Sequence, residues 1–227
     1  MNKIGIERES SLHRILKFRY AGPDGQTEVD AGGYVADGVS AGGEFIEVQT
    51  GSFAPLRQKA RELASRGGLR IIHPVIVVKY IEVLDSGGKV LYRRKSPRRG
   101  NPWDLFAALL YAPELPLIPG LSIELALLDI VEKRIQDGKG SWRRKGLSIL
   151  NREPFTWHES IALESLKDYR RFVPFKKSEE FTTFLLAERV GIGVHTARKT
   201  LYVLTKLKIV KRIGKKGNTW VYTLKAR

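Results

Sequence analysis

Hydrophobic and polar positions change their spacing within the first third of the chain. Leu12, Ile15 and Leu16 follow a helical spacing and predict a helix from about residue 6 to residue 20. Short apolar runs separated by turn-forming residues come next, and this pattern predicts strands. The strands are expected around residues 27–29, at 33–39 and at 45–49, with a hairpin turn at 40–43.

A second helix and a long apolar strand follow this meander. Pro55 suits the first position of a helix, which is expected to end at Gly67 and Gly68. The β-branched run at 69–78 predicts a buried central strand, in which Pro74 is expected to mark a bulge or break. The predicted order is helix, three strands, helix and strand, and it indicates an α/β fold.

The middle of the chain is expected to add strands and one more helix. A hairpin is predicted at 80–92, and a basic loop follows it at 93–100. Asn101 suits the N-cap of a helix that should run to about Tyr111. Residues 122–135 fit either a strand or a helix, and the strand is favoured.

The last part of the chain changes to a helix, a turn, a helix and a β-hairpin. Helices are predicted at 181–190 and 194–207, and hairpin strands at 209–213 and 219–224. This order resembles a winged helix-turn-helix, a DNA-binding unit. We therefore expect a first domain at 1–112, a connector with a β-hairpin at 113–152 and a DNA-binding domain at 153–227.

Composition favours a polyanionic partner. Lys and Arg together number 40 against 24 Asp and Glu, and the formal net charge is +16. From His195 to the C-terminus there is no acidic residue. Nucleic acid is expected rather than a membrane, because no apolar run approaches the roughly 18 residues that a spanning helix needs. The cytoplasm of a prokaryotic-type cell is the expected location. Since the chain has no cysteine, disulfides, thiolate metal sites and cysteine nucleophiles are excluded.

Two acidic residues fall at the ends of the strands that the turn at 40–43 joins. Pairing through this turn brings Asp37 roughly opposite Glu47. Two carboxylates at one place repel each other unless a cation lies between them, and Mg²⁺ prefers such oxygen ligands. The simpler interpretation is two acids at strand ends that face water.

A Glu in a helix, an Asp in a strand and Glu-x-Lys at the end of the next strand are the layout of the PD-(D/E)XK nuclease superfamily. Glu9, Asp37, Glu47 and Gln49 resemble this signature over about residues 6–80, and Gln49 takes the place where the family usually has Lys. The resemblance implies a restriction-endonuclease-like mixed sheet flanked by helices. It also implies Mg²⁺ or Mn²⁺ held by Asp37, Glu47 and Glu9, with Gln49 as a fourth catalytic residue.

The C-terminal helix and hairpin carry the residues expected to contact duplex DNA. On the helix these are His195, Thr196, Arg198, Lys199 and Tyr202. On the hairpin they are Lys211, Arg212, Lys215, Lys216 and Asn218. A second basic set is expected to neutralise phosphates near the cutting site: Arg93, Arg94, Arg98, Arg99, Arg143 and Arg144.

The favoured function is a Mg²⁺-dependent DNA nuclease that its winged helix loads onto duplex DNA, and a homodimer is expected if both strands are cut. The alternative is a DNA-binding regulator with a degenerate nuclease fold. The chain also resembles an uncharacterised bacterial family in segments such as Ser11-Leu12-His13 and Trp142 to Gly146. His13 either faces the site or is structural, and His73 is expected in the core.

Overall fold

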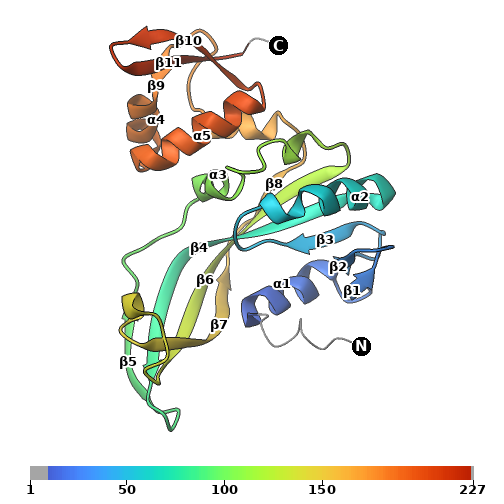
Figure 1. Ribbon diagram of the computed structural model, residues 1–227, viewed down its shortest axis with the longest axis vertical. Coiled ribbons are helices and arrows are strands. Elements are labelled where there is room, and N and C mark those ends of the chain that lie inside the picture. The colour runs from blue at the N-terminus through green and yellow to red at the C-terminus, as the bar shows by residue number, and fades with distance from the viewer. Residues whose placement is uncertain (1–9, 226–227) are drawn as a thin grey trace.

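A mixed sheet with helices on both faces forms most of the protein (Figure 1). The computed structural model describes residues 10–225, and within them this sheet has eight strands. Its main path is β1 (Gln26–Asp30), β2 (Val35–Val39), β3 (Phe45–Val48), β4 (Leu69–Leu84), β6 (Leu121–Gln136) and β7 (Leu147–Trp157). The strand β5 (Val90–Lys95) pairs with β4, and β8 (Ile161–Leu163) pairs with β6. Neighbouring strands are antiparallel except for β3 with β4 and β4 with β6, which are parallel.

Two helices cover opposite faces of this sheet. The first, α1 (Ser11–Ala21), is capped by Ser10, whose side chain accepts a hydrogen bond from the backbone N–H of His13. Leu12 and Leu16 of α1 pack in one apolar cluster with β3 and β4. The second, α2 (Arg57–Gly67), lies in a separate cluster on the other face. The predicted order of helix, three strands, helix and strand is confirmed.

The two longest strands, β4 and β6, run parallel from the Leu69–Leu121 pair to the Leu84–Ile135 pair. The favoured strand assignment for residues 122–135 is confirmed. The strand β4 continues through Pro74, where a bulge or break was expected. Pro74 is tolerated because β3 has ended on that side of β4, so the missing N–H has no ladder partner to lose.

The segment at 113–152 is not a connector, because β6 and much of β7 are members of the large sheet. The boundary expected at residue 153 falls inside β7, and the sheet continues to β8. The helix expected from residue 101 to Tyr111 is shorter. It consists of a 3-10 turn (Pro102–Asp104) and α3 (Leu105–Ala108). Asn101 caps it as predicted, through a side-chain oxygen 3.0 Å from the Trp103 nitrogen.

The C-terminal part consists of two helices and a small sheet. The helices are α4 (Thr183–Val190) and α5 (Val194–Lys206). The strands β10 (Val210–Lys216), β11 (Thr219–Leu224) and β9 (Phe181–Thr182) pair in that order. Gly191 ends α4 in the left-handed conformation with φ 67°, which a residue without a Cβ adopts without strain.

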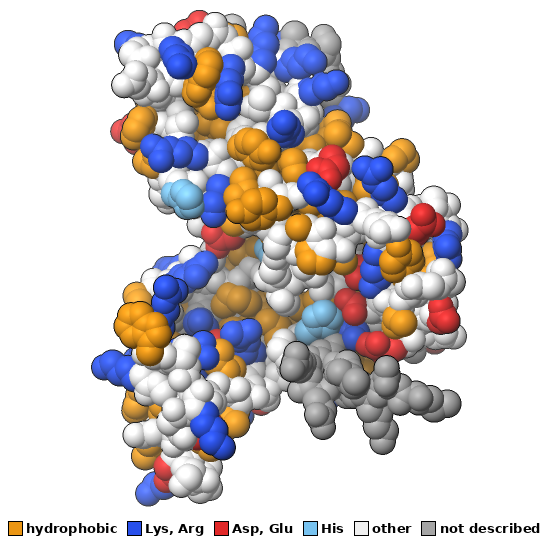
Figure 2. All heavy atoms as spheres, in the orientation of Figure 1, with side chains coloured by type: hydrophobic (Ala, Val, Ile, Leu, Met, Phe, Trp, Pro, Cys, Tyr) orange, Lys and Arg blue, Asp and Glu red, His pale blue; other side chains and the backbone are white. Residues whose placement is uncertain are grey.

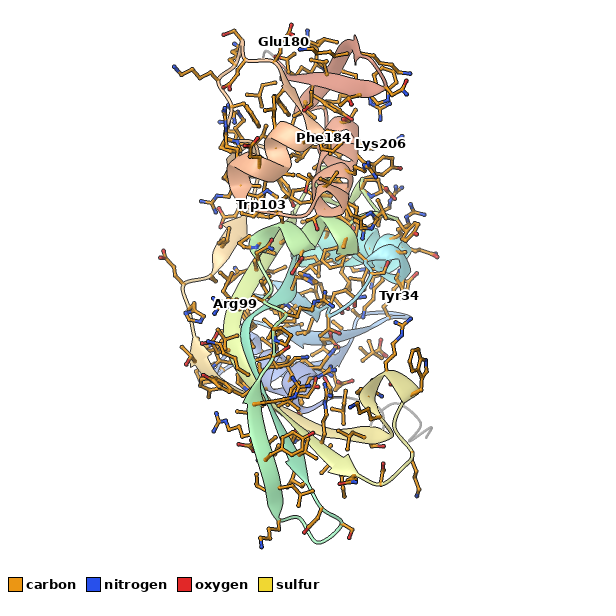
Figure 3. All side chains as sticks on the ribbon, turned by 90° about the vertical axis from the view of Figure 1, so that its left-hand side faces the viewer. Tyr34, Arg99, Trp103, Glu180, Phe184 and Lys206 are labelled. Atoms are coloured by element: carbon orange, nitrogen blue, oxygen red, sulfur yellow. The ribbon has the colours of Figure 1, made fainter. Side chains whose placement is uncertain are left out.

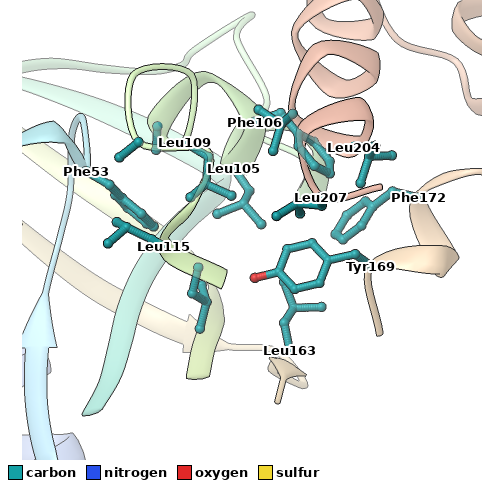
Figure 4. Packing of buried hydrophobic residues seen from close by; sticks show 14 of the residues in the cluster. Phe53, Leu105, Phe106, Leu109, Leu115, Leu163, Tyr169, Phe172, Leu204 and Leu207 are labelled. Carbon is teal, nitrogen blue, oxygen red and sulfur yellow. The ribbon is translucent and has the colours of Figure 1, made fainter. Parts of the chain in front are cut away.

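This C-terminal part packs directly against the sheet domain through a shared buried cluster (Figure 3). Phe106 of α3, Phe172, and Leu204 and Leu207 around the end of α5 belong to one buried cluster, as Figure 4 shows. The rings of Phe106 and Phe172 meet edge to face with centroids 4.8 Å apart. We therefore expect the two parts to unfold together. Within residues 10–225, no helix is long and apolar enough to cross a membrane.

Candidate functional site

Asp37 and Glu47 meet where β2 and β3 separate. The ladder between these strands ends at the Gly38–Ile46 pair. Beyond it, the backbone N–H of Asp37 donates to Glu47 Oε1 over 3.1 Å, and the N–H of Val48 donates to Asp37 Oδ2 over 2.8 Å. The two carboxylates thus take the place of backbone acceptors between the strands. The sequence prediction that these two residues come together is confirmed.

Basic side chains from both flanking helices approach this pair. From α1, His13 Nε2 lies 3.2 Å from Asp37 Oδ2, and Lys17 Nζ lies 3.5 Å from Asp37 Oδ1. From α2, Lys59 Nζ lies 2.6 Å from Glu47 Oε1. The carboxylate pair is therefore surrounded by positive charge from two faces of the sheet.

Lys17 and Lys59 were missed by the sequence analysis, although their spacing carries a signal. Lys59 follows Leu56 by three positions and precedes Leu63 by four, so it belongs to the buried stripe of its helix. Lys17 comes directly after Leu16, which is fully buried, and is itself only 6% exposed. A lysine in an apolar helix stripe is a sign that a buried carboxylate lies opposite it.

Glu28 is a further partner of Lys17. The pairs on either side, Thr27–Gly38 and Val29–Ala36, keep one register, so Glu28 lies opposite Asp37. Its φ of 56° is uncommon for a residue other than glycine. Its carboxylate accepts a hydrogen bond from Lys17. Lys17 is therefore shared between Glu28 and Asp37, and it joins the outer strand to the site.

The two carboxyl groups are shifted in opposite directions. Burial pushes the pKa of Asp37 upward, but hydrogen bonds from His13 and Val48 and the charges of His13 and Lys17 outweigh it, so the pKa is below its ordinary value. The pKa of Glu47 is raised, first by burial and then by the charge of Asp37, against the opposing effect of Lys59. Asp37 is thus the firmly ionised member of the pair, and Glu47 takes up a proton more readily.

Gln49, the fourth predicted catalytic residue, does not point to the carboxylates. Its side-chain amide donates to the carbonyl of Ser52 in the following loop. Its own carbonyl lies 2.6 Å from His73 Nδ1, so this ring nitrogen carries the proton. Burial lowers the pKa of His73 and keeps the ring neutral, as expected for a core residue. Position 49 therefore supplies no positive charge to the carboxylate pair, and Lys59 of α2 supplies one instead.

The donor set suits a hard divalent cation only in part. Glu9, the third predicted ligand, lies outside the described residues. Among residues 10–225 there is no group of three or more His, Cys, Asp and Glu placed to hold a metal ion. Mg²⁺ is commonly bound by one or two carboxylates together with substrate phosphates, so Asp37 and Glu47 fit that pattern. An ion between them would share their charge with Lys17 and Lys59.

The C-terminal part presents most of its predicted DNA contacts on one side. His195, Arg198 and Tyr202 form an exposed stripe on α5, and Lys199 and Thr196 are half-buried beside it. The five hairpin residues proposed as contacts are all exposed: Lys211, Arg212, Lys215, Lys216 and Asn218. A groove of about 250 Å³ separates the helix from the hairpin, with side chains of both along its walls.

Four residues of the second basic set lie away from the carboxylate pair, contrary to expectation: Arg93, Arg94, Arg143 and Arg144. Arg93 and Arg94 are in β5, and Arg93 pairs with Glu82 far along β4. At about 3.3 Å per residue, the eleven positions between Ile71, the partner of Glu47, and Glu82 correspond to roughly 36 Å. Arg143 and Arg144 lie in the turn between β6 and β7, close to that same end. Arg98 and Arg99 follow β5 and are exposed.

Comparisons with known proteins give a family but no activity. The family described as "Domain of unknown function (DUF8091)" matches residues 10–164. This range ends one residue after β8, so it contains the large sheet. A Treponema pallidum (strain Nichols) protein described as "Uncharacterized protein" is 27% identical over 215 residues, which are 95% of this chain and 85% of the relative. No solved structure matches the chain.

Proposed function

The chain belongs to the DUF8091 family, and we propose that it is a Mg²⁺-dependent DNA nuclease whose C-terminal winged helix-turn-helix holds duplex DNA. One observation carries the proposal: Asp37 and Glu47 meet at the point where two strands separate, and Lys59 is bound to Glu47. The order α1, β1, β2, β3, α2, β4, with helices on opposite faces, supports a restriction-endonuclease-like core.

Asp37 and Glu47 would hold the metal ion, together with Glu9 as the sequence predicts. When bound, the ion would lower the pKa of a coordinated water and offset charge on the scissile phosphate. Asp37 is suited to this role because its lowered pKa keeps it ionised well below neutral pH. His13, hydrogen-bonded to Asp37, fixes the orientation of that carboxylate.

Lys59 would do what Gln49 does not. A charged donor stabilises negative charge that develops on a phosphate, whereas an amide only donates a hydrogen bond. The side chain of Lys59 is 20% exposed, so it retains access to a ligand while bound to Glu47. The same chemical role would thus be performed from the helix α2 instead of from the end of β3.

The C-terminal part supports the DNA-holding half of the proposal. The exposed stripe of α5 would enter the major groove, and the basic hairpin would contact the backbone. Arg212 and Lys215 also lie over the ring of Trp220, at 4.8 Å and 4.6 Å from its centroid, which stiffens the hairpin surface. A cytoplasmic location and pairing of two copies for double-strand cutting complete the proposal.

Cleavage of a supercoiled plasmid tests it. Wild-type protein with Mg²⁺ should nick or linearise the plasmid, and the Asp37→Asn variant should not. Asp24→Asn, which changes an exposed acid in the turn after α1, is the matched control and should cleave like wild type. Equal residual cleavage by wild type and Asp37→Asn would mean a contaminating nuclease and would remove the enzyme claim.

A non-enzymatic DNA-binding regulator is the second candidate, and one observation favours it. Lys17 and Lys59 already balance the charges of Asp37 and Glu47 without a metal. In that case the charge cluster only joins α1 and α2 to the sheet. Duplex binding by wild type, with no cleavage in Mg²⁺ or Mn²⁺, would support this function over the nuclease.

A further inference from the structure

A cleft of about 520 Å³ opens beside the carboxylate pair. It follows from a gap in the pairing of β4, because β3 pairs with this strand only as far as Ile72 and pairing with β5 starts only at Tyr80. Leu12, the neighbour of His13, and the loop at 50–52 that follows β3 form its edge toward Asp37 and Glu47. Figure 2 shows the molecule hollowed between the end that carries β5 and the rest.

Three basic side chains line this cleft. Lys79 comes from β4, Arg98 from the segment after β5, and Arg152 from β7. The segment that carries Arg98 is held against β4 by two backbone hydrogen bonds, from Ser96 N to Lys79 O and from Gly100 N to Ile76 O. The basic groups therefore converge from three separate parts of the chain.

Glu132 organises this basic end without neutralising it. The carboxylate is 1% exposed and accepts hydrogen bonds from Arg134 Nε over 2.8 Å and from Arg152 Nε over 2.9 Å. Lys79 Nζ is farther away, at 3.6 Å. Arg98 and Asp104 also line the cleft, so two negative charges face four positive ones, and the cluster keeps an excess of positive charge for an anionic ligand.

Another part of the cleft wall is apolar. Leu12, Ile76 and Ile130 line it, and they belong to the cluster that α1 covers or pack against it. A cleft with a basic end and an apolar wall matches the two halves of a nucleotide, a phosphate and a base. Its volume lies within the range of small-ligand sites, which is too small for a duplex but sufficient for one unpaired nucleotide.

We propose that this cleft receives a nucleotide of an unpaired nucleic-acid strand, with the phosphate against Lys79, Arg98 and Arg152 and the base against the apolar wall. The inference rests on the proposed function and specifies its substrate class. The C-terminal part holds a duplex, and a single-stranded tail of the same molecule enters the cleft next to Asp37 and Glu47.

Fluorescence anisotropy with EDTA present tests this independently of cleavage. The probes are a blunt DNA hairpin and the same hairpin with a single-stranded tail. Wild type should bind the tailed probe about tenfold more tightly than the blunt probe. A tenfold difference in affinity corresponds to about the contribution of one charge-assisted hydrogen bond, so removing one such group should abolish the preference. Arg98→Gln and Lys79→Gln should each remove most of this preference and leave binding of the blunt probe unchanged. Lys89→Gln, an exposed lysine in the β4–β5 turn, is the control and should behave like wild type.

The outcomes separate this inference from the nuclease proposal. Arg98 is exposed, so its replacement should not affect folding. For Lys79→Gln, a melting temperature equal to that of wild type would show that the variant is folded. Equal affinity of wild type for the two probes, or an unchanged preference in Arg98→Gln, overturns the inference. If a nucleoside monophosphate binds the protein while the tailed and blunt probes bind equally well, the inference is also overturned, and the cleft is a site for free nucleotides. A tail preference without Mg²⁺-dependent cleavage supports the cleft while refuting the nuclease.

Discussion

Lys59 places its ammonium nitrogen 2.6 Å from Glu47 Oε1, although the two residues come from different elements. The superfamily signature would put a lysine two positions after this glutamate, where the chain has Gln49. The structure thus has a positive charge at the carboxylate pair without having it in the expected sequence position. A motif search along β3 alone would classify the site as degenerate.

Replacing Lys59 should reduce cleavage. Lys59→Met keeps much of the side-chain volume and removes the charge, and we expect a loss on the order of 10² in rate, comparable to removing one charged or oxyanion-type donor. Plasmid cleavage with Mg²⁺ measures it. Arg61→Gln removes an exposed charge from the same helix and should leave the rate unchanged. A Lys59→Met variant with the wild-type rate would show that Lys59 has only a structural role.

The opposite pKa shifts of the two carboxyl groups predict a coupled titration. Asp37→Asn removes the charge that helps to raise the pKa of Glu47, so that pKa should fall. Lys59→Met removes the opposing positive charge, so the pKa of Glu47 should rise further. Carbon-detected NMR titration of the Glu47 side chain measures both changes. Shifts in the same direction in the two variants would contradict the assigned contacts.

The pH dependence of stability follows from the same shifts. Because the pKa of Asp37 is lowered by folding, Asp37 contributes stability above its unfolded pKa, and this contribution is lost as the pH falls through the folded value. Glu47, whose pKa is raised, contributes stability at low pH that is lost as the pH rises. Urea denaturation of Asp37→Asn should therefore show a smaller decrease in stability on acidification than wild type. A larger decrease would contradict the sign of the Asp37 shift.

The packing of the two parts predicts cooperative unfolding. Phe106→Ala should lower the free energy of unfolding by about 3–5 kcal/mol, because this ring of α3 is fully buried and packs against Phe172. Wild type should unfold in one transition by circular dichroism and by tryptophan fluorescence. In Phe106→Ala, separation into two transitions is expected, since this contact couples the parts. Two transitions already in wild type would show that they are independent.

The hairpin charges predict the salt dependence of duplex binding. Lys215→Gln and Lys216→Gln should weaken binding uniformly across DNA sequences, and each should reduce the slope of log K against log salt by about 0.9. Anisotropy titrations at several salt concentrations measure the slope. Leu185→Gln changes an exposed apolar residue of α4 and serves as a control without a charge change. An unaltered slope in both lysine variants would place the DNA elsewhere.

The order of elements around the candidate site was predictable because its signals are local. The hairpin turn at 40–43 sets the register that brings Asp37 to Glu47, and Asn101 caps its helix through its own side chain. The cations around the site were not predictable in the same way. Lys17 and Lys59 reach it only through packing of their helices on opposite faces, which depends on contacts distant in sequence.

The basic clusters show the opposite error. Arg93 and Arg143 were placed near the site by charge alone, but the lengths of β4 and β6 carry them to the far end of the sheet. The segment at 113–152 was predicted to be a connector, although residues 122–135 were favoured as a strand. Its strand β6 is in fact central, with β4 on one side and β7 on the other, and only this pairing reveals that. Glu132 was missed because its three basic partners lie on three different strands, β4, β6 and β7.

Binding of Mn²⁺, followed by electron paramagnetic resonance of the free ion, tests most directly whether the carboxylate pair is a metal site. In the presence of a short duplex, wild type and Asp24→Asn should both bind Mn²⁺, and Asp37→Asn should not. Identical Mn²⁺ uptake by wild type and Asp37→Asn would contradict the account and leave the charged cluster as a purely structural link between helices and sheet.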